Sequence, residues 1–432
     1  MQLSPKFVER MKKQLPADEW EAFFAVYENP PFKGVRVNSL KCSATEFLRI
    51  SPFAISPVKW EKNGFYVAEE KVGAHPYHFA GVYYSQEPSA MCAAPLLEAE
   101  PYERVLDLCS APGGKGTQLA AAMDGKGLIV LNEPVFSRAK ILSQNVERMG
   151  IKNAVVTCAK PQELAKRLTG YFDKILVDAP CSGEGMFRKN EKEAIAEWSE
   201  ENVFFCAARQ KEILEEATKM LAAGGRLVYS TCTFSDEEDG GQVCDYLKNH
   251  PEMRLLKTEK IYPHKEDGEG HFAALFAKTD GSDGFVKSLK PFCPKASEKE
   301  YRAFEKSFFF APFASVLHEE NGVLYALPED AFDFHGLQVL RAGVRLGNLK
   351  NGRFEPDHSL AMCARATECR NVVTLTLSDE RTEKFLRGET IETDGENGWW
   401  LVCVDIFPIG LGKRVNGIVK NHIPKALRKA GV

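Results

Sequence analysis

The sequence contains no run of about 18 or more apolar residues, so nothing in it predicts a membrane-spanning helix. Its N-terminal segment, MQLSPKFVERMKKQLP, has no apolar core of the kind that a signal peptide needs. The 12 cysteines include no C-x-x-C pair, which excludes a zinc knuckle and a thioredoxin-type motif, and we expect no bound metal. Scattered single thiols without a secretion signal predict a cytoplasmic protein.

A large excess of charge of one sign is also absent. The net charge is −4, so the electrostatic field of the whole molecule does not predict a polyanion partner. The charge is uneven, however, because no acidic residue follows Asp405 while several basic ones do. These are Lys413, Arg414, Lys420, Lys425, Arg428 and Lys429. Such a tail is typical equally of a solvated chain end and of a segment that grips a phosphate backbone.

From Arg104 onward, short apolar runs alternate with longer helical stretches, in a chain of 432 residues that is long enough for several domains. The apolar runs predict strands over 104–109, 127–133, 153–158, 173–180 and 226–232. The intervening stretches predict helices over 113–123, 137–150, 161–170, 203–225 and 236–250. This alternation predicts an α/β fold with a parallel, doubly wound sheet. Residues 270–279 are interpreted as a final edge strand, and 279–291 as a linker.

The first strand-to-helix turn of that sheet is DLCSAPGGKG, residues 107–116. Ligands of doubly wound sheets bind beyond the carboxyl ends of the strands, and closely spaced glycines let backbone N–H groups approach them. The loop has neither G-x-G-x-x-G, which argues against NAD, nor G-x-x-x-x-G-K-[ST], which argues against ATP. Glu133, at the end of the second strand, can accept from ribose hydroxyls. Loop and acid together favour S-adenosylmethionine over the alternative that Glu133 only caps the next helix.

Two further strand ends carry unusual sequence. Asp178 and Cys181 stand in DAPCSGEG, and Cys232 stands in YSTCTF. Both segments are expected at the same edge of the sheet as the glycine loop, so both thiols can face one crevice. A free cysteine is usually a buried packing residue. Polar loops on a rigid scaffold nevertheless carry function more often than packing, which favours a functional role for both thiols.

Two thiols beside a methyl donor indicate covalent catalysis on a pyrimidine. Attack of a thiolate at C6 makes C5 electron-rich, methyl transfer follows, and removal of the C5 proton frees the enzyme. A helix expected to begin at SDEED, directly after Cys232, would favour the thiolate through its N-terminus, while its acidic side chains would oppose that effect. Asp178 can hydrogen-bond the ring edge of the base. This chemistry leaves open which thiol attacks and which assists elimination.

DLCSAPGGK, DAPCSGEG and YSTCTF resemble the cofactor loop, the Pro-Cys motif and the Thr-Cys motif of the Nop/Sun family of RNA cytosine-5 methyltransferases. Residues 73–91 and 268–278 resemble the segment before the catalytic domain and its closing strand. Residues 410–428 resemble the PUA-like domain of the RsmF branch, bacterial enzymes that act on small-subunit ribosomal RNA.

The resemblance implies a Rossmann-like class I S-adenosylmethionine-dependent methyltransferase with an N-terminal α+β extension and a C-terminal PUA-like RNA-binding region. The implied domains are an N-terminal RNA-binding or extension domain over 1–92, a catalytic domain over 93–280, a linker with a first C-terminal domain over 281–370, and a PUA-like RNA-binding domain over 371–432.

The family pattern also implies a role for each motif residue. Cys232 is the nucleophile at C6, Cys181 assists release, and Asp178 lies between the cofactor and the target base. The residues implied to hold S-adenosylmethionine are Cys109, Ser110, Ala111, Pro112, Gly113, Gly114, Lys115, Glu133 and Asp178. The family often has an Asp or Asn after the third strand that contacts adenine. This chain has Cys158, Ala159 and Lys160 there, so the adenine contact stays unassigned.

The resemblance implies methyl transfer to C5 of a cytosine in 16S ribosomal RNA by a monomeric protein without a membrane partner, and transfer RNA is the alternative substrate. A DNA cytosine-5 methyltransferase also attacks with a Pro-Cys thiol, but YSTCTF and the basic tail favour RNA. An amino-group methyltransferase would have [DN]-P-P-[YF] where this chain has DAPC. A non-catalytic RNA-binding assembly factor would need neither thiol.

Polar and aromatic residues before the catalytic region allow two interpretations. Arg36 and Asn38 in GVRVNSL can contact RNA, but we favour an exposed polar pair on a strand. Several aromatic residues can stack on unpaired bases, but we favour a packing seam between the N-terminal region and the catalytic sheet. These are Tyr77, Phe79, Tyr83 and Tyr84.

Overall fold

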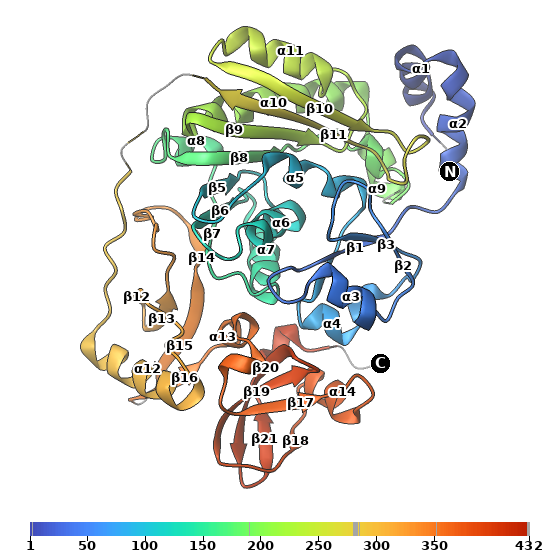
Figure 1. Ribbon diagram of the computed structural model, residues 1–432. Helices are drawn as coiled ribbons and strands as arrows, with labels where there is room; N and C mark the ends of the chain where they lie inside the picture. Colours follow the sequence, from blue (N-terminus) through green and yellow to red (C-terminus); the bar gives the residue numbers. More distant parts are fainter. Residues whose placement is uncertain (2, 190, 280–283, 285, 351, 430–432) are drawn as a thin grey trace.

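The structure, a computed structural model, describes residues 1, 3–189, 191–279, 284, 286–350 and 352–429 (Figure 1). The described residues form four sheets, and an eight-stranded sheet lies at the centre of the molecule. A small N-terminal sheet lies beside it, and two C-terminal sheets lie below it in the view of Figure 1. The strand order of the central sheet is β10-β11-β9-β8-β5-β6-β7-β14.

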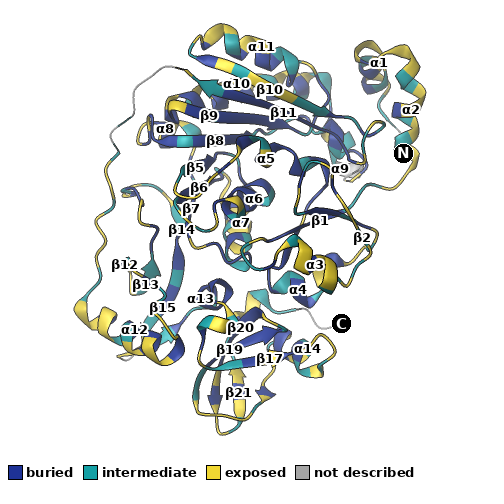
Figure 2. Ribbon diagram, viewed as in Figure 1, coloured by how far each residue is buried: buried dark blue, intermediate teal, exposed yellow. Residues whose placement is uncertain are grey.

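Five parallel strands form the middle of the central sheet. They are β5 (Arg104–Asp107), β6 (Leu128–Asn132), β7 (Ala154–Thr157), β8 (Phe172–Asp178) and β9 (Leu221–Thr231). The helices of this region are α5 (Ala93–Leu97), α6 (Gly114–Ala122), α7 (Phe136–Arg148), α8 (Pro161–Ala165), α9 (Glu191–Glu197), α10 (Glu200–Met220) and α11 (Gly240–Asn249). The strands are apolar and buried because helices cover both faces (Figure 2), and a hydrophobic core lies on each face. The predicted doubly wound sheet is confirmed.

Three predicted elements differ from the structure. Residues 270–279 contain β11 (His271–Lys278), which lies between β9 and β10 (Met253–Ile261) and is therefore an interior strand, not an edge. LAAGG, expected to end a helix, instead opens β9. The helix expected at SDEED is α11, and it begins at Gly240. The acidic residues before it do not form its first turn, because Glu238 and Asp239 are buried as hydrogen-bond acceptors.

The N-terminal region consists of two helices followed by a small sheet. Its elements are α1 (Pro5–Gln14), α2 (Trp20–Ala25), β1 (Gly34–Val37), α3 (Ala44–Ile50), β2 (Ile55–Pro57), β3 (Gly64–Val67), α4 (Pro76–Phe79) and β4 (Tyr83–Ser85). The sheet order is β2-β3-β1-β4. Aromatic rings of α1 and α2 share a core with Phe187, Trp198 and Phe234 of the central region. The N-terminal helices therefore pack directly behind the loops that follow β8 and β9.

The prediction that Arg36 and Asn38 form an exposed pair is wrong, because only 2% and 1% of their surfaces are exposed. Asn38 Nδ2 donates to the carbonyl oxygens of Gly81 (2.9 Å) and Met149 (2.8 Å). β1 pairs with β3 on one edge and with β4 on the other, all four of its residues are buried, and Arg36 hydrogen-bonds α6. Both side chains join the N-terminal sheet to the central region and cannot contact RNA.

The first C-terminal segment adds a strand to the central sheet. Its elements are α12 (Lys295–Phe308), β12 (Leu317–Glu320), β13 (Val323–Ala326), β14 (Val339–Ala342), β15 (Val344–Lys350), β16 (Arg353–Pro356) and α13 (His358–Cys363). Four of these strands form the sheet β12-β13-β15-β16, but β14 pairs antiparallel with β7. Arg341 of β14 is buried and donates to Ser359 Oγ (2.8 Å), and it pairs with Glu147 of α7. The sequence pattern did not predict this added edge strand.

The last segment forms a five-stranded sheet that packs against the N-terminal sheet. Its elements are β17 (Val372–Leu375), α14 (Glu380–Leu386), β18 (Ile391–Glu392), β19 (Gly398–Val404), β20 (Phe407–Val415) and β21 (Ile418–Asn421). One hydrophobic core contains residues of both sheets, including Val35, Phe65 and Val402. Tyr77 Oη donates to Asp405 Oδ2 at 2.6 Å. The aromatic seam that Tyr77 forms is therefore with the C-terminal sheet, not with the catalytic sheet as predicted.

No helix in the described part of the chain has both the length and the apolar character needed to cross a bilayer.

Candidate active site

One cavity of about 950 Å³ opens at the carboxyl ends of the parallel strands. Five predicted site residues from four strand ends line it, namely Cys109, Glu133, Asp178, Cys181 and Cys232. Ala111 of the glycine loop lines it too. The other predicted residues of the loop do not line the cavity. They are Ser110, Pro112, Gly113, Gly114 and Lys115. The fold thus brings together the strand ends that the sequence singled out.

The glycine loop turns sharply from β5 into α6. Gly113 has a φ of 111°, a left-handed conformation that residues with a side chain disfavour. Arg36 of β1 supports the loop from behind, because its guanidinium donates to the carbonyl oxygen of Gly114 at 2.5 Å. Arg138 of α7 donates to the carbonyl oxygen of Ala111 at 3.0 Å. Two arginines that the sequence pattern did not single out for this role therefore fix the shape of the loop.

Asp178, at the end of β8, is the centre of a polar cluster. Its Oδ2 accepts from Lys115 Nζ and its Oδ1 from Ser230 Oγ, each at 2.8 Å, and His271 Nε2 lies 3.9 Å from Oδ1. Burial raises the pKa of Asp178, but Lys115, His271 and Ser230 together outweigh it and hold that pKa below its ordinary value. Asp178 is therefore an ionised acceptor at neutral pH, and Lys115 directs its ammonium group to this carboxylate.

Glu133 is buried directly after β6 and has two contacts. Its Oε1 accepts from the backbone N–H of Val135, the N-cap residue of α7, at 2.9 Å. Its Oε2 lies 3.3 Å from Arg138 Nη1. Glu133 therefore holds the start of α7 through Val135 and Arg138, although its side chain does not cap the first N–H groups of that helix, as the alternative from the sequence required. Because Glu133 also lines the cavity, one carboxylate both supports α7 and borders the space where a ligand can bind.

The two predicted thiols touch. Cys181 Sγ and Cys232 Sγ are 3.2 Å apart, and the backbone N–H of Cys232 donates to Cys181 Sγ at 3.3 Å. The hydrogen bond to Cys232 and burial raise the pKa of Cys181 well above its ordinary value. Cys181 therefore keeps its proton and can donate its S–H to the sulfur of Cys232. The contact between the two sulfurs could not be derived from the sequence.

A buried carboxyl group, Glu238, joins the two thiol loops. Its Oε2 accepts from the backbone N–H of Ser182 at 3.0 Å and from Gln210 Nε2 at 2.7 Å. Ser182 Oγ in turn hydrogen-bonds Thr233 Oγ1 at 2.8 Å. Burial raises the pKa of Glu238 to about 7, against the hydrogen bonds from Ser182 and Gln210. Since Ser182 and Thr233 directly follow the two cysteines, this network fixes the position of one sulfur relative to the other.

A second buried carboxylate, Glu184, supports the same loops. It accepts from the backbone N–H of Phe234 at 2.9 Å and from Ser235 Oγ at 2.8 Å. The next residue, Gly185, donates its N–H to the carbonyl oxygen of Cys232 at 2.9 Å. A Cβ at Gly185 would lie only 2.7 Å from the carbonyl oxygen of Gly270, so no side chain fits there. In the sequence, the only sign of these supporting contacts was the presence of acidic and glycine residues close to each cysteine.

The cavity wall beyond β6 and β7 offers a different set of groups. Pro134, Val135 and Pro161 make it partly apolar, and Gln162 contributes an amide. The sequence offered no amide or carboxylate at 158–160, and Gln162 lies just beyond that stretch. The cations that line the cavity are Arg138, Lys160, Lys166 and Arg209. A carboxylate, an apolar wall and an amide are the chemistry that an adenosyl group requires.

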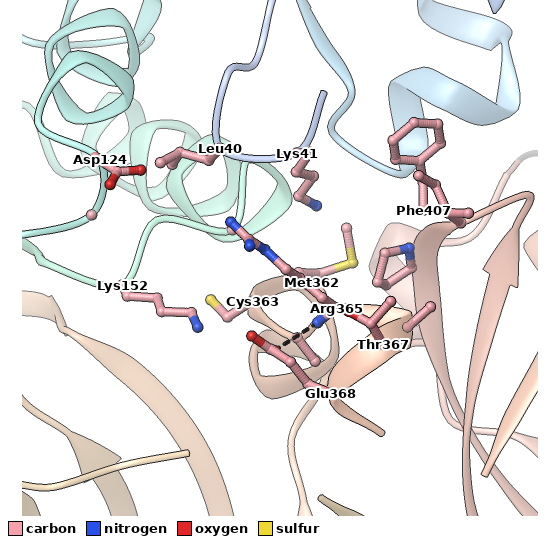
Figure 3. Close-up of a pocket in the computed structure, with 16 residues that line it drawn as sticks. Leu40, Lys41, Asp124, Lys152, Met362, Cys363, Arg365, Thr367, Glu368 and Phe407 are labelled. Carbon is pink, nitrogen blue, oxygen red and sulfur yellow. Dashed lines mark hydrogen bonds between the residues drawn. The ribbon is translucent and has the colours of Figure 1, made fainter. Parts of the chain in front are cut away.

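A second cavity, of about 390 Å³, lies where the N-terminal, central and C-terminal regions meet. Figure 3 shows Lys41, Lys152 and Arg365 around it, together with Cys363. Lys41 Nζ donates to the carbonyl oxygens of two neighbouring segments, so its ammonium group serves packing. Lys152 precedes β7, which places this cavity at the amino ends of the parallel strands. Ligands of such sheets bind at the carboxyl ends, so the first cavity is the candidate active site.

Comparisons with known proteins show the family to which the chain belongs. Residues 94–289 match the family 16S rRNA methyltransferase RsmB/F. Residues 3–88, 303–363 and 372–429 match the N-terminal domain, the first C-terminal domain and the PUA domain of RsmF. Ribosomal RNA small subunit methyltransferase F of Vibrio vulnificus is 34% identical over 462 residues, which cover 98% of this chain and 97% of the relative. The chain belongs to the RsmF family.

A second sequence relative and a solved structure are also similar to this RsmF-family chain. Ribosomal RNA small subunit methyltransferase F of Shewanella oneidensis is 32% identical over 470 residues, which cover 99% of this chain and 98% of the relative. The crystal structure of a methyltransferase homologue from Pyrococcus horikoshii has a TM-score of 0.56 and 27% identity, and covers 64% of this chain and 100% of that chain. The predicted class I methyltransferase fold, dependence on S-adenosylmethionine and C-terminal PUA domain are confirmed.

The basic residues in the tail of this RsmF-family chain differ in their contacts and exposure. Arg414 is buried and donates to the carbonyl oxygen of Thr393 at 2.9 Å, and Lys429 pairs with Glu383 at 2.8 Å. These cations stabilise the domain itself. The exposed cations of the tail, which can face a polyanion, are Lys413, Lys420 and Lys425.

Proposed function

We propose that this chain transfers a methyl group to C5 of a cytosine in 16S ribosomal RNA, through a covalent bond between Cys232 and C6 of the base. The contact between the two thiols, 3.2 Å apart in a cavity shared with Glu133 and Asp178, is the observation that carries the proposal. The ribosomal substrate rests on the relatives, which are ribosomal RNA small subunit methyltransferases. A bacterial ribosomal substrate would place the enzyme in the cytoplasm, where it would act as a monomer.

The residues present fit S-adenosylmethionine. Glu133 would accept from the ribose hydroxyls, and Pro134, Val135 and Gln162 would surround the adenine. In the glycine loop, Cys109 to Lys115, the backbone would hold the methionine end, with Cys109 and Ala111 as the loop residues that line the cavity. When bound, the cofactor supplies the methyl group that C5 accepts.

Cys232 begins the reaction by adding its thiolate to C6 of the cytosine. A sulfur–carbon bond forms, the C5=C6 double bond breaks, and its electron pair makes C5 nucleophilic. Once C5 carries the methyl group, a base removes the C5 proton. The electrons of that C–H bond restore the double bond, and the sulfur of Cys232 leaves as thiolate. Cys181 then stabilises the departing sulfur, because its S–H is held 3.2 Å away.

Asp178 orients the target base. Its ionised carboxylate accepts a hydrogen bond from the 4-amino group of cytosine, while Lys115 and Ser230 hold it in place. This contact favours cytosine over uracil, since uracil presents a carbonyl oxygen instead of an amino group at that position.

Substitution of each thiol tests the assignment. With Cys232→Ala we expect no methyl transfer from labelled S-adenosylmethionine to 16S ribosomal RNA, because no sulfur can reach C6. With Cys181→Ala we expect attack without efficient release, so a protein–RNA adduct accumulates on a denaturing gel.

Near-normal methylation by Cys232→Ala would refute the assignment of the nucleophile. An adduct with Cys232→Ala and none with Cys181→Ala would reverse the two roles. Cys244→Ala is the matched control, because that thiol is exposed on α11, and we expect wild-type methylation and no adduct.

A further inference from the structure

The helix that forms one wall of the catalytic cavity, α10, carries an exposed aromatic ring that the proposed reaction does not use. Phe205 lies in the first half of α10, and 65% of its surface is exposed. Its neighbour Phe204 is 58% exposed. Each exposes a large apolar surface to water without contributing to a described core, so a role in packing does not account for either.

The two rings point in different directions. Phe205 lies four residues before Arg209 and seven before Glu212, a spacing that puts all three on one row of the helix surface. Arg209 and Glu212 line the catalytic cavity, so Phe205 continues that wall by one turn. Phe204 instead lines a groove formed with α1 and α11.

The start of α10 lies at the catalytic edge of the sheet. α10 leads into β9, which runs toward the thiols, so the helix runs the opposite way and its first half is close to them. Gln210 Nε2 confirms this, since it donates to the carbonyl oxygen of Pro180 at 3.0 Å, beside Cys181. The ring of Phe205 is therefore at the mouth of the cavity and outside the space that holds the reacting atoms.

Cations lie on the cavity side of this ring. Arg209 is one turn away on the same row, and Lys160, Lys166 and Arg138 line the same cavity, together with the carboxyl groups of Glu133, Glu163, Asp178 and Glu212. An exposed aromatic ring beside cations is the combination that binds single-stranded nucleic acid, with the ring stacking on a base and the cations close to phosphates. A peptide partner would not require the cations.

We propose that Phe205 is a stacking platform for an unpaired base next to the target cytosine. The proposal rests on the proposed function, in which a cytosine enters the cavity. A base that enters such a cavity must leave its stack, and its neighbour then loses a stacking partner. The ring of Phe205 replaces that partner, so it positions the RNA strand without touching the reacting atoms.

Binding measured without cofactor tests the platform directly. The probe is a fluorescein-labelled single-stranded oligoribonucleotide with a central cytosine, titrated with the full chain and followed by anisotropy. We expect Phe205→Ala to weaken binding about 5- to 150-fold, the range found when a base loses its aromatic stacking partner. Phe205→Trp, which keeps a stacking surface, is expected to bind within about twofold of wild type.

Phe204→Ala is the matched control, because it removes an equally exposed ring from the adjacent face and is expected to bind as wild type. Equal binding by Phe205→Ala and wild type would overturn the proposal. So would equal weakening by Phe204→Ala, or failure of Phe205→Trp to restore binding. Unchanged melting temperatures of all three variants are expected, since no described core includes either ring.

Turnover separates this proposal from the proposed function. With naked 16S ribosomal RNA, Phe205→Ala is expected to raise the KM for RNA and leave kcat near wild type. Wild-type protein that binds the probe through Phe205 but transfers no methyl group would refute the function and keep the platform. A defect of Phe205→Ala confined to assembled small subunits, with normal binding of naked RNA, would overturn the platform in favour of a protein contact.

Discussion

At the scale of single residues, the protonation state of Asp178 reflects a competition between opposed effects. Burial favours the neutral acid, whereas Lys115, His271 and Ser230 favour the carboxylate and outweigh it. His271 is a neutral ring at neutral pH, because burial lowers its pKa to about 3. The ammonium group of Lys115 is therefore the one full positive charge within hydrogen-bond distance of Asp178 in the described structure.

Lys115→Met tests this balance. Without the ammonium group, burial is less opposed and the pKa of Asp178 rises, so the carboxylate is lost at a higher pH. We expect the acid limb of kcat/KM against pH to move to higher pH, measured with saturating S-adenosylmethionine. Lys126→Met, which removes a lysine paired at the surface with Asp124, is the control and should keep the wild-type profile. An unmoved acid limb in Lys115→Met would contradict the assignment of Asp178 as the ionised acceptor.

At the scale of elements, the loops after β8 and β9 are held together by a carboxyl group whose protonation depends on folding. Glu238 is fully buried, and its pKa is raised to about 7. The folded protein therefore keeps this proton up to about neutral pH, whereas the unfolded chain releases it near the ordinary value for glutamate. The stabilisation from this proton is complete below the unfolded pKa and is lost as pH rises through the folded pKa.

Glu238→Gln is expected to remove this dependence. The amide mimics the protonated acid, so it keeps hydrogen-bond partners for Ser182 and Gln210 at every pH. We expect the wild-type free energy of unfolding to fall by about 3 kcal/mol more than that of the variant between pH 4.5 and 8, in urea titrations. Parallel curves for the two proteins would show that Glu238 does not titrate on folding.

The strands and the helices between them could be predicted because a strand of a parallel sheet is buried on both faces. Such a strand is therefore visible in the sequence as a short, continuous apolar run. The start of α11 could not be predicted, since SDEED has the composition of a helix N-terminus. Only burial in the folded protein makes Glu238 and Asp239 hydrogen-bond acceptors instead of first-turn residues. The prediction that Arg36 is exposed was wrong for a similar reason. A polar residue on a short strand gives no local sign that neighbouring elements bury it.

The candidate site was predictable to the level of strand ends. Cys109, Glu133, Asp178, Cys181 and Cys232 line one cavity because parallel strands bring their carboxyl ends to one edge. What could not be predicted is which groups touch, such as the sulfur–sulfur contact and the pairing of Lys115 with Asp178. The catalytic roles of these residues stay predictions until the variants are measured.

At the scale of the whole molecule, the hydrophobic cores cross the predicted domain boundaries. One core combines α1 and α2 with Phe234, another combines the N-terminal and C-terminal sheets, and a third combines Phe332 with the catalytic sheet. The domain boundaries at 92, 280 and 370 stay predictions from the sequence, and the shared cores do not follow them. The folded molecule is expected to unfold cooperatively across them.

Arg341→Met tests the coupling between β14 and the catalytic region. The substitution leaves the carboxylate of Glu147 without its buried partner, and we expect a loss of about 3 kcal/mol in the free energy of unfolding. Arg345→Met is the control, since Arg345 is partly exposed beside Asp357 and should contribute less than about 1 kcal/mol. Circular dichroism during urea unfolding gives both values. Equal losses for the two variants would show that the β14 connection is no stronger than a surface ion pair.

The position of β14 has a consequence for synthesis on the ribosome. Its pairing partner β7 emerges about 180 residues before it, so a nascent chain carries an open sheet edge for about 10 to 40 s at ordinary elongation rates. An open edge presents unpaired N–H and C=O groups that can recruit another chain. A chain terminated after residue 289 would keep that edge permanently, so this truncated chain is expected to aggregate during expression where the full-length chain does not.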